Sequence, residues 1–378
     1  MPESEKYAQA FMKNELAFTL IGQQLQWSDS DFEKEFRELQ LMVDHKYDSY
    51  QGFQPATRFH VALLNWLSQF PTLPQRQTAY NFVKDRLIFI SQREMHHLVS
   101  MLMPIVERLE RKRIAAELRI PLFQTELQPA ATSRIELLRR RTLFVGLSDG
   151  ARIDVFRRYN EGRISNEQVV AFSEISDNKW VDLQQELKKS IARRGFSDEN
   201  PWFEVVCLVD DFSGSGSSLL RYKNGEWKGK IYKFYEANKS RIKDKLAPNC
   251  LLHIHHHLAT EQAKCQIEED LERFSKEFQE FEYMVTFSFV LPGDIVINDN
   301  DHCVDLVELL KSWYDAGIAD DHTGPDIWYG YKNCGLPLVL EHNTPNNSVA
   351  LLWATSKDGA NLQMKPLFAR RKRHSSNG

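Results

Sequence analysis

VVCLVDDFSGSGSSLL, residues 205–220, is the stretch that decides the fold we expect for this chain. Residues 205–209 are apolar and rich in β-branched side chains, which is typical of a parallel strand buried on both faces. Asp210 and Asp211 follow at the carboxyl end of this strand. A loop of small residues comes next, and a helix is expected to begin at Leu219-Leu220. The pattern predicts a strand-loop-helix unit whose backbone N–H groups face an anion.

The two halves of this stretch suit two different chemical groups. Adjacent carboxylates suit vicinal hydroxyls or a hydrated Mg²⁺ ion, which prefers oxygen ligands, while a glycine-serine loop suits one phosphate monoester. A ribose 5-phosphate carries both groups. The stretch is not a P-loop, because no Gly-Lys-Ser/Thr closes it, and it is not a dinucleotide fingerprint, because the acidic residues precede the glycines. Ser215 stands between two glycines rather than at the centre of Gly-x-Ser-x-Gly, which excludes a nucleophile elbow.

A second unit of the same kind lies about sixty residues earlier in the chain. Residues 142–145, Thr-Leu-Phe-Val, predict a short strand, and residues 146–153, Gly-Leu-Ser-Asp-Gly-Ala-Arg-Ile, predict a glycine-bounded turn before a renewed apolar pattern. The motif is short, and a plain turn between a strand and a helix would read the same way.

Both stretches together resemble the type I phosphoribosyltransferases. In that family an apolar strand leads to two acidic residues and a small-residue loop, and a pyrophosphate loop ends the first core strand. The resemblance implies that Asp210 and Asp211 hold the ribose hydroxyls of phosphoribosyl pyrophosphate (PRPP), act in catalysis and bind Mg²⁺. It further implies a 5′-phosphate loop made by Ser213, Gly214, Ser215, Gly216, Ser217 and Ser218. The pyrophosphate loop would comprise Ser148, Asp149, Gly150, Ala151 and Arg152.

Composition is that of an ordinary globular protein. Of the 378 residues, 42% are hydrophobic and 26% are charged, so a large core and two substructures are expected. The formal net charge of −4 gives no general argument for binding nucleic acid or an anionic membrane. No apolar run approaches the roughly 20 residues that span a bilayer, and the N-terminus lacks a signal-peptide core, so we expect a cytoplasmic protein with no membrane contact. The five cysteines show no CxxC spacing and predict reduced, structural thiols.

The remaining segments are read from their periodicity. Residues 3–130 are expected to be mainly helical, with Pro104 kinking or dividing a helix. Residues 168–175 predict a strand, and residues 176–194, which carry a basic stripe, are either a solvated helix face or the mobile stretch that covers the active site in related enzymes. Further strands are predicted at 230–235, 250–257 and 281–291, with a charged helix at 261–281.

The histidines suggest packing more than metal binding. His253, His255 and His257 alternate along a predicted strand and share one face, which makes a metal site conceivable. No acidic or cysteine partner stands at a recognisable spacing, so buried polar contacts are the favoured interpretation. His96 and His97 are neighbours on a helix and point to different sides, so ordinary surface or packing roles are expected.

The C-terminal third is rich in aromatic and amide side chains. Its segment His-Asn-Thr-Pro-Asn-Asn, residues 342–347, resembles a phosphoribosyltransferase-like family associated with bacterial conflict (anti-phage) systems. By this resemblance the segment is a hood that contacts the acceptor, although prolines and asparagines also form plain turns. The hood residues would be Trp328, Tyr329, His342, Asn343 and Asn346. A basic tail, residues 370–374, is either a solvated terminus or a contact to nucleic acid.

We therefore expect an α/β fold, a type I phosphoribosyltransferase-like core with a parallel sheet, a helical N-terminal extension and a C-terminal hood. The expected boundaries are 1–130 for the helical region, 131–300 for the core, and 301–378 for the hood and basic tail. The leading hypothesis is an anti-phage effector that binds Mg²⁺ and PRPP, or a related ribose phosphate, and acts at the anomeric carbon. Gly214 stands where purine-type members often carry an acidic base, which leaves the acceptor unidentified. The alternatives are a non-catalytic nucleotide sensor that regulates a conflict-system protein or a nucleic-acid-containing complex, and a hydrolase of nucleotide N-glycosidic bonds.

Overall fold

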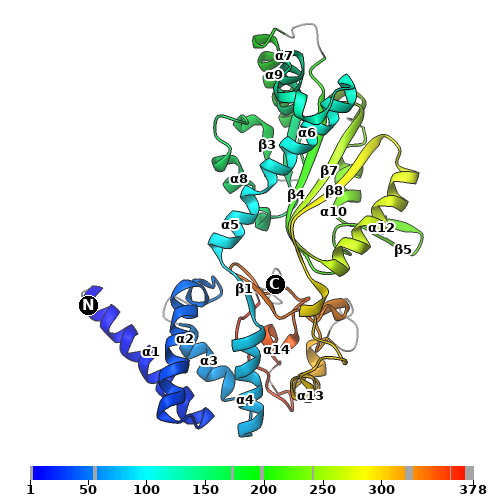
Figure 1. Ribbon diagram of the computed structural model, residues 1–378. Coiled ribbons are helices and arrows are strands. Elements are labelled where there is room, and N and C mark those ends of the chain that lie inside the picture. Colours follow the sequence, from blue (N-terminus) through cyan, green and yellow to red (C-terminus); the bar gives the residue numbers. More distant parts are fainter. Residues whose placement is uncertain are drawn as a thin grey trace. The chain divides into compact units, whose positions relative to one another are not determined.

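The computed structural model describes residues 3–53, 58–171, 174–195, 200–240, 242–319, 327–357 and 359–370. Contacts divide the chain into two compact units (Figure 1). The first unit comprises Met1–Glu94 and Gly293–Gly378, and the second unit comprises Met95–Pro292. This grouping differs from three consecutive segments, because the C-terminal part of the chain packs with the N-terminal helices.

The second unit is built on a five-stranded sheet in which every neighbouring pair is parallel. Its strands are β2 (Thr142–Gly146), β3 (Val169–Val170), β4 (Phe203–Ser213), β7 (Leu246–Thr260) and β8 (Phe281–Leu291). The spatial order is β3-β2-β4-β7-β8. From β2 the chain first adds β3 on one side, and it then adds β4, β7 and β8 in succession on the other side of β2. The order reverses between β2 and β4, and ligands of doubly wound sheets bind beyond the carboxyl ends of the strands at such a point.

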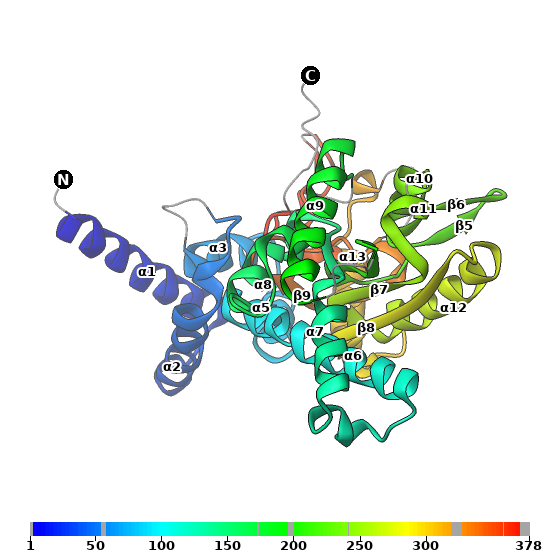
Figure 2. The ribbon, with the colours of Figure 1, turned by 90° about the horizontal axis from the view of Figure 1, so that it is seen from above.

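Helices cover both faces of this sheet because its central strand is apolar on both faces. Val206 and Leu208 of β4 pack in the core formed with α9 (Asp177–Arg193), α10 (Lys230–Asn238) and α12 (Glu261–Glu277). Cys207 and Val209 pack in the core formed with α5 (Gln92–Ser100), α6 (Leu102–Leu118) and α8 (Ile153–Tyr159), and α7 (Pro129–Arg140) joins α6 on the same face. Seen from above, α6 and α10 lie on opposite sides of β7 (Figure 2). The predicted α/β core with a parallel sheet is confirmed.

Several predicted elements occur at or near their expected bounds. The strands at 142–145, 250–257 and 281–291 are β2, the later part of β7, and β8, and the helix at 261–281 is α12. Residues 176–194 contain α9. Pro104 lies in the first turn of α6, and the chain breaks between α5 and α6 at Met101, as the missing proline N–H predicts. The strand expected at 168–175 is limited to β3, and residues 172–173 lie outside the described part of the chain.

Two expectations after the central strand are wrong. No helix begins at Leu219, because the chain first forms a hairpin of β5 (Arg221–Lys223) and β6 (Glu226–Lys228). Its turn is Asn224-Gly225, with φ values of 56° and 82°, and Asn-Gly is the strongest short signal for a two-residue hairpin. That signal stands in the sequence and outweighs the apolar pair before it.

The strand expected at residues 230–235 is also wrong, since these residues begin α10. The tyrosine-rich run reads as an alternating strand, but the buried side chains are Ile231 and Phe234, which are spaced three residues apart. This spacing places both on one side of a helix, facing the sheet. Gly229 precedes the helix at φ 117°, where an added Cβ would lie 2.4 Å from the Leu219 carbonyl oxygen.

The first unit is a mainly helical body with a small parallel ribbon. Its elements are α1 (Glu3–Leu25), α2 (Asp29–His45), α3 (Phe59–Leu67), α4 (Leu73–Asn81), β1 (Ile88–Ile90), α13 (Val304–Ser312), β9 (Leu338–Leu340) and α14 (Ala350–Trp353). β1 pairs with β9, which joins the N-terminal and C-terminal segments of this unit. One hydrophobic core contains Phe18, Trp66, Val339 and Leu352 from both segments. Within the described ranges, no helix combines the length and the apolar character that crossing a membrane requires.

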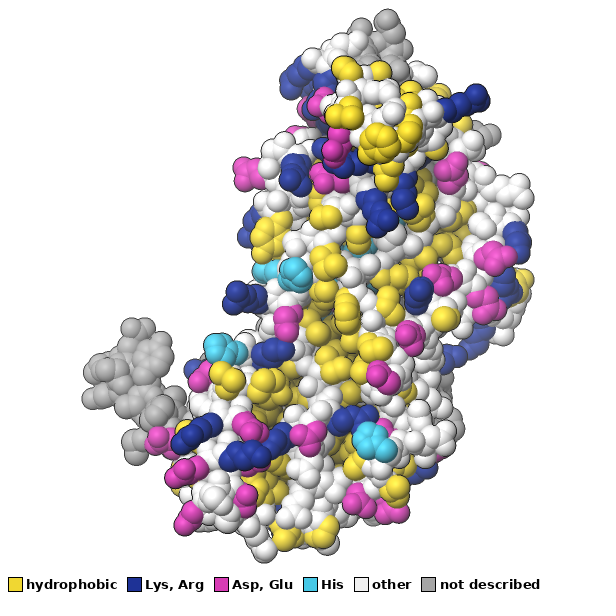
Figure 3. Space-filling view, in the orientation of Figure 1, with side chains coloured by type: hydrophobic (Ala, Val, Ile, Leu, Met, Phe, Trp, Pro, Cys, Tyr) yellow, Lys and Arg dark blue, Asp and Glu magenta, His cyan; other side chains and the backbone are white. Residues whose placement is uncertain are grey.

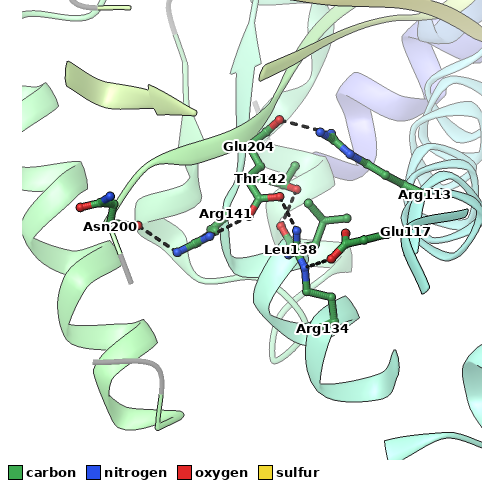
Figure 4. A network of polar contacts seen from close by, with 8 residues as sticks. All are labelled: Arg113, Glu117, Arg134, Leu138, Arg141, Thr142, Asn200 and Glu204. Carbon is green, nitrogen blue, oxygen red and sulfur yellow. Dashed lines mark hydrogen bonds and ion pairs between the residues drawn. The ribbon is translucent and has the colours of Figure 1, made fainter. Parts of the chain in front are cut away.

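A buried ion-pair network fixes the start of β4 in the second unit (Figure 4). Glu204 accepts hydrogen bonds from Arg134 at 2.8 Å and from Arg141 at 2.7 Å. Arg134 also contacts Glu117, and Arg141 donates to the carbonyl of Asn200 at 2.9 Å. Burial alone would raise the pKa of Glu204, but the two arginines outweigh it and hold that pKa below its usual value. The network thereby joins α7 to the first residues of β2 and β4.

We predict that Glu204→Gln destabilises the protein by about 3–5 kcal/mol at pH 7, because it leaves the buried guanidinium of Arg141 without a carboxylate and removes one of the two that Arg134 contacts. The measurement is the free energy of unfolding from a denaturant titration. Glu272→Gln is the matched control, since Glu272 pairs with Lys276 at 2.8 Å with both side chains 71% exposed. The control should change stability by less than about 1 kcal/mol, as exposed pairs do. Equal losses in the two variants would contradict the role given to Glu204.

Candidate functional site

The candidate site lies at the carboxyl ends of β2 and β4, where the strand order reverses. The first of the two acidic residues, Asp210, is 1% exposed, whereas Asp211 is half-buried. Ser148, two residues beyond β2, donates its hydroxyl to Asp210 Oδ1 at 2.6 Å and lies 3.3 Å from Asp211 Oδ1. The structure thus brings together residues of two loops that are about sixty positions apart in the sequence.

Lys230 is a part of this site that sequence reasoning missed. It is the first residue of α10, and its ammonium group forms an ion pair with Asp210 Oδ2. Burial raises the pKa of Asp210, although Lys230 opposes that shift, and the neighbouring Asp211 adds to it. The prediction of a strand at residues 230–235 gave no reason to place Lys230 beside Asp210, whereas the start of α10 does place it there. The hairpin signal at Asn224-Gly225, followed by a helix start at Gly229, could have found it.

His256 approaches the same carboxylate from β7. Its Nε2 lies 3.9 Å from Asp210 Oδ2, and its ring stacks on Phe287 with centroids 6.1 Å apart. Burial, together with the charge of Lys230, lowers the pKa of His256 to about 3. His256 is therefore neutral at physiological pH, and Lys230 supplies the positive charge beside Asp210.

The loop after β2 passes so close to Asp211 that it has room only for glycine at one position. A Cβ on Gly150 would lie 2.1 Å from Asp211 Oδ2, inside any normal contact distance. The carbonyl of the next residue, Ala151, accepts a hydrogen bond from His257 Nε2 at 3.0 Å. Arg152 ends the turn in the left-handed region, at φ 49°. Asp149 is exposed at the tip of the turn, so the loop presents backbone and one carboxylate to solvent.

The loop after β4 is anchored at one end and has unbonded donors at the other. The Gly214 carbonyl accepts from Thr260 at 2.7 Å, and Gly216, at φ 77°, packs against α12, where a Cβ would meet Gln266 at 3.0 Å. The hydroxyls of Ser215 and Ser217 lie 2.9 Å apart. Within the described chain, the N–H groups of residues 215–218 make no hydrogen bond. These donors suit an anion that the loop would enclose.

The helix N-terminus expected beside this loop is not available in the way the sequence pattern suggests. The N–H groups of Lys230 and Ile231, at the start of α10, donate to the carbonyls of Ser218 and Leu219 at 3.2 and 3.1 Å. The loop itself therefore satisfies these two donors. An anion at residues 215–218 would depend on loop N–H groups and serine hydroxyls, because the first turn of α10 is occupied.

The other histidines of β7 form buried polar contacts on the opposite face of the strand. His253 and His255 both hydrogen-bond with the Thr286 hydroxyl, at 2.7 and 2.9 Å, and His255 also hydrogen-bonds with Ser288 at 3.0 Å. Among the described residues, no group of three or more histidine, cysteine or acidic side chains is placed to hold a metal ion. The geometry agrees with packing. His96, on α5, lies edge-on against Tyr159 with centroids 6.2 Å apart.

The predicted hood residues belong to the first unit and make contacts within it. Tyr329 is buried and donates its hydroxyl to Asp299 at 2.7 Å, and Trp328 packs edge-on against Tyr314. The carbonyl of Asn346 accepts from the Tyr331 N–H at 2.7 Å, and Leu340 and Asn343 exchange backbone hydrogen bonds. His342 follows β9 in the same turn and is half-buried. Their role toward an acceptor stays a prediction.

Two further expectations concern the basic segments of the chain. Of the basic tail, Arg370 is described and lies over the Trp353 ring at 5.7 Å, while residues 371–374 lie outside the described part. Lys188 and Lys189 are exposed on α9, and Lys189 pairs with Glu186 at 2.6 Å. Whether α9 moves over the site is a prediction that the structure does not test.

Fold and site together define a phosphoribosyltransferase-like α/β protein, with paired carboxylates and two small-residue loops at the switch point of a 2-1-3-4-5 sheet. Comparison with protein families agrees, since the model of the PRTase-CE family matches residues 63–370. The chain belongs to this phosphoribosyltransferase-like family. Comparisons with curated proteins and with solved structures found no match.

We predict a pH dependence of stability from the histidines of β7. Burial lowers the pKa of His253 to about 4 and holds that of His255 well below its usual value. Below about pH 6.5 these histidines are protonated in the unfolded chain but stay neutral in the folded protein, which favours unfolding. Their contribution to stability is therefore present above pH 6.5 and is lost as the pH falls toward 4. The free energy of unfolding should fall by up to about 1.4 kcal/mol per pH unit for each histidine.

The measurement is denaturant unfolding at several pH values between 7.5 and 5. His255→Asn should flatten the slope relative to wild type, because it removes one fully buried imidazole. A slope that is the same in wild type and in His255→Asn would show that this histidine does not titrate on unfolding.

Proposed function

We propose that the second unit binds PRPP, or a related ribose phosphate, together with Mg²⁺, and acts at the anomeric carbon. The observation that carries this proposal is the meeting of Ser148 with both Asp210 and Asp211 at the strand ends. Family membership supports the class of ligand. The identity of the acceptor is left open.

The two loops offer complementary donors for the two ends of such a ligand. The unbonded N–H groups of residues 215–218 would receive the 5′-phosphate. Asp210 and Asp211 would accept hydrogen bonds from the ribose hydroxyls, and Ser148 holds both carboxylates in register. The backbone of residues 148–152 would face the pyrophosphate, because Gly150 lets that loop approach the carboxylates without a side chain between them.

The donor set fits Mg²⁺ when a diphosphate completes it. Mg²⁺ is usually bound by one or two carboxylates together with substrate phosphates and water, so a cage made by protein alone is not needed. Asp211 would be the principal protein ligand, since it is half-buried whereas Asp210 is only 1% exposed. When bound, the ion would neutralise charge on the diphosphate.

The reaction proposed is substitution at the anomeric carbon. The bond from that carbon to the diphosphate oxygen breaks, its electron pair leaves with the diphosphate, and a new bond forms to the acceptor. Positive charge develops on the ribosyl ring, and the carboxylates of Asp210 and Asp211 would stabilise it. Lys230 would hold Asp210 ionised and fixed in position while this charge develops. Gly214 offers no acidic base, so the acceptor would arrive deprotonated or lose its proton to another group.

One observation favours a second candidate, non-catalytic nucleotide binding. The charge of Lys230 offsets that of Asp210, which lowers the negative charge available to a developing cation. A sensor would need the phosphate loop and the carboxylates for recognition alone. A third candidate, hydrolysis of a nucleotide N-glycosidic bond, would be distinguished from transfer and from sensing by one observation: free base would be released from a nucleotide in the absence of PRPP. The anti-phage setting and its protein or nucleic-acid partner stay predictions of the sequence resemblance.

The proposal predicts that calorimetric titration with PRPP shows binding that Mg²⁺ strengthens. The double variant Asp210→Asn, Asp211→Asn should bind at least about tenfold more weakly, because each lost charged hydrogen bond contributes roughly 1.5–3 kcal/mol. Asp182→Asn, at an exposed aspartate of α9, is the matched control and should bind as wild type does. Circular dichroism and the melting temperature verify that each variant is folded.

The same samples are assayed for pyrophosphate in the presence of candidate acceptors. Release of pyrophosphate makes the protein an enzyme, and binding without release favours the sensor. Full PRPP affinity in the folded double variant would overturn the assignment of Asp210 and Asp211.

A second variant tests the close approach of the two loops. Gly150→Ala should lower PRPP affinity at least about tenfold, roughly 1.4 kcal/mol, because the new Cβ displaces the Asp211 carboxylate. Gly162→Ala is the control: nothing lies within 4 Å of its Cβ, so it carries only the strain of φ 82°. Equal affinities in the two alanine variants would mean that the spacing of Gly150 and Asp211 does not matter for the ligand.

A further inference from the structure

A cavity of about 670 Å³ lies in the second unit away from the candidate site. Its walls come from the end of α7, the turn between α8 and β3, and the last turns of α9. Five arginines and three glutamates line it, which gives the wall a formal charge of +2. In Figure 3, Lys and Arg side chains gather around the end of this unit where α7 and α9 lie.

The cavity lies at the opposite edge of the sheet from Asp210. Arg140 precedes β2 and Gln168 precedes β3, so the lining residues stand at the amino ends of these strands. Ser148 and Asp210 stand at the carboxyl ends. β2 is five residues long, which at 3.3 Å per residue separates the two edges by roughly 16 Å. The cavity is therefore distinct from the PRPP site proposed above.

Arg140 is the residue that makes this cavity unusual. Its side chain lines the wall, yet the residue is only 6% exposed. Its side chain makes no hydrogen bond or ion pair with any described residue, and its Nε is buried without an acceptor. Burial lowers the pKa of Arg140, with Arg194 adding to the shift, while the charges of Glu167 and Glu186 oppose it. A buried guanidinium without a hydrogen-bonded carboxylate is unfavourable unless an anion reaches it.

The neighbouring arginines differ from Arg140 in having partners or solvent. Arg139 is bound by Glu110 at 3.0 Å, and Arg163 lies 3.5 Å from Glu107. Arg193 and Arg194 are exposed at the rim, and Arg194 donates to the Ser190 carbonyl at 3.1 Å. Of the glutamates, Glu186 already pairs with Lys189. An entering anion would therefore meet the buried Arg140 and the exposed side chains of Arg193 and Arg194.

We propose that this cavity is a second anion site that binds a small polyphosphate or a phosphorylated metabolite through Arg140, Arg193 and Arg194. Guanidinium groups bind phosphate oxygens through paired hydrogen bonds, and several arginines spaced around a cavity suit more than one phosphate. The volume lies within the range of small-molecule sites. Glu167 and Glu186 in the wall disfavour a single, weakly charged anion, because only a multiply charged ligand gains enough from three arginines to overcome their repulsion.

The experiment is calorimetric titration of the full chain with inorganic triphosphate at low salt, without PRPP. Arg140→Gln should weaken triphosphate binding at least tenfold, and Arg194→Gln, at the exposed rim where folding is not at risk, should weaken it severalfold. Lys188→Gln is the matched control, because Lys188 lies on the exposed side of α9 outside the cavity. It should bind as wild type does. Raising the salt concentration should weaken binding in wild type.

Gly150→Ala separates this cavity from the pyrophosphate loop. Triphosphate binding at the cavity should be retained in Gly150→Ala and weakened in the two arginine variants, whether or not PRPP binds elsewhere. The opposite pattern, loss in Gly150→Ala with full binding in Arg140→Gln and Arg194→Gln, would overturn the proposal. Failure of triphosphate to bind wild type, or equal binding in all variants, would overturn it as well.

Discussion

The burial of Asp210 at the end of an apolar strand is the constraint on which the candidate site depends. A carboxylate that is 1% exposed must be compensated, and here Lys230 provides a charge and Ser148 a hydroxyl. These two partners come from opposite directions in the sequence, one before the strand and one after the hairpin that follows it. The same contacts thus join the loop after β2, the end of β4 and the start of α10 into one arrangement.

This compensation also influences the chemistry. Asp210 is 1% exposed and paired with Lys230, whereas Asp211 is half-buried, so Asp211 is the more accessible of the two carboxylates. Gly150 brings the loop backbone beside Asp211, and a side chain at this position would have to displace the carboxylate. His256 also lies beside Asp210, and it adds no charge there because it is neutral at physiological pH. The two carboxylates therefore differ: Asp210 is buried and paired with Lys230, and Asp211 is the more exposed of the two.

Local sequence signals predicted the sheet and the position of both loops, because buried parallel strands and small-residue turns are determined by nearby residues. Val205–Val209 and Phe281–Leu291 are strands as expected. The errors arose where two local signals compete. The Tyr-rich run after Gly229 has the alternation of a strand but forms α10, and the apolar pair Leu219-Leu220 suggests a helix where the Asn224-Gly225 turn instead forms a hairpin. The partnership of Lys230 with Asp210, and the orphaned guanidinium of Arg140, depend on tertiary packing and have no local signal at all. The joining of β1 with β9 is equally long-range.

A crystal structure of the wild-type protein with PRPP and Mg²⁺ would show where the ligand binds. We expect the 5′-phosphate within about 3 Å of the N–H groups of residues 215–218, and the ribose hydroxyls against Asp210 and Asp211. We also expect the ion pair between Lys230 and Asp210 to persist. Ligand density at another place in the second unit, with the loop after β4 empty at saturating PRPP, would contradict the assignment of the site.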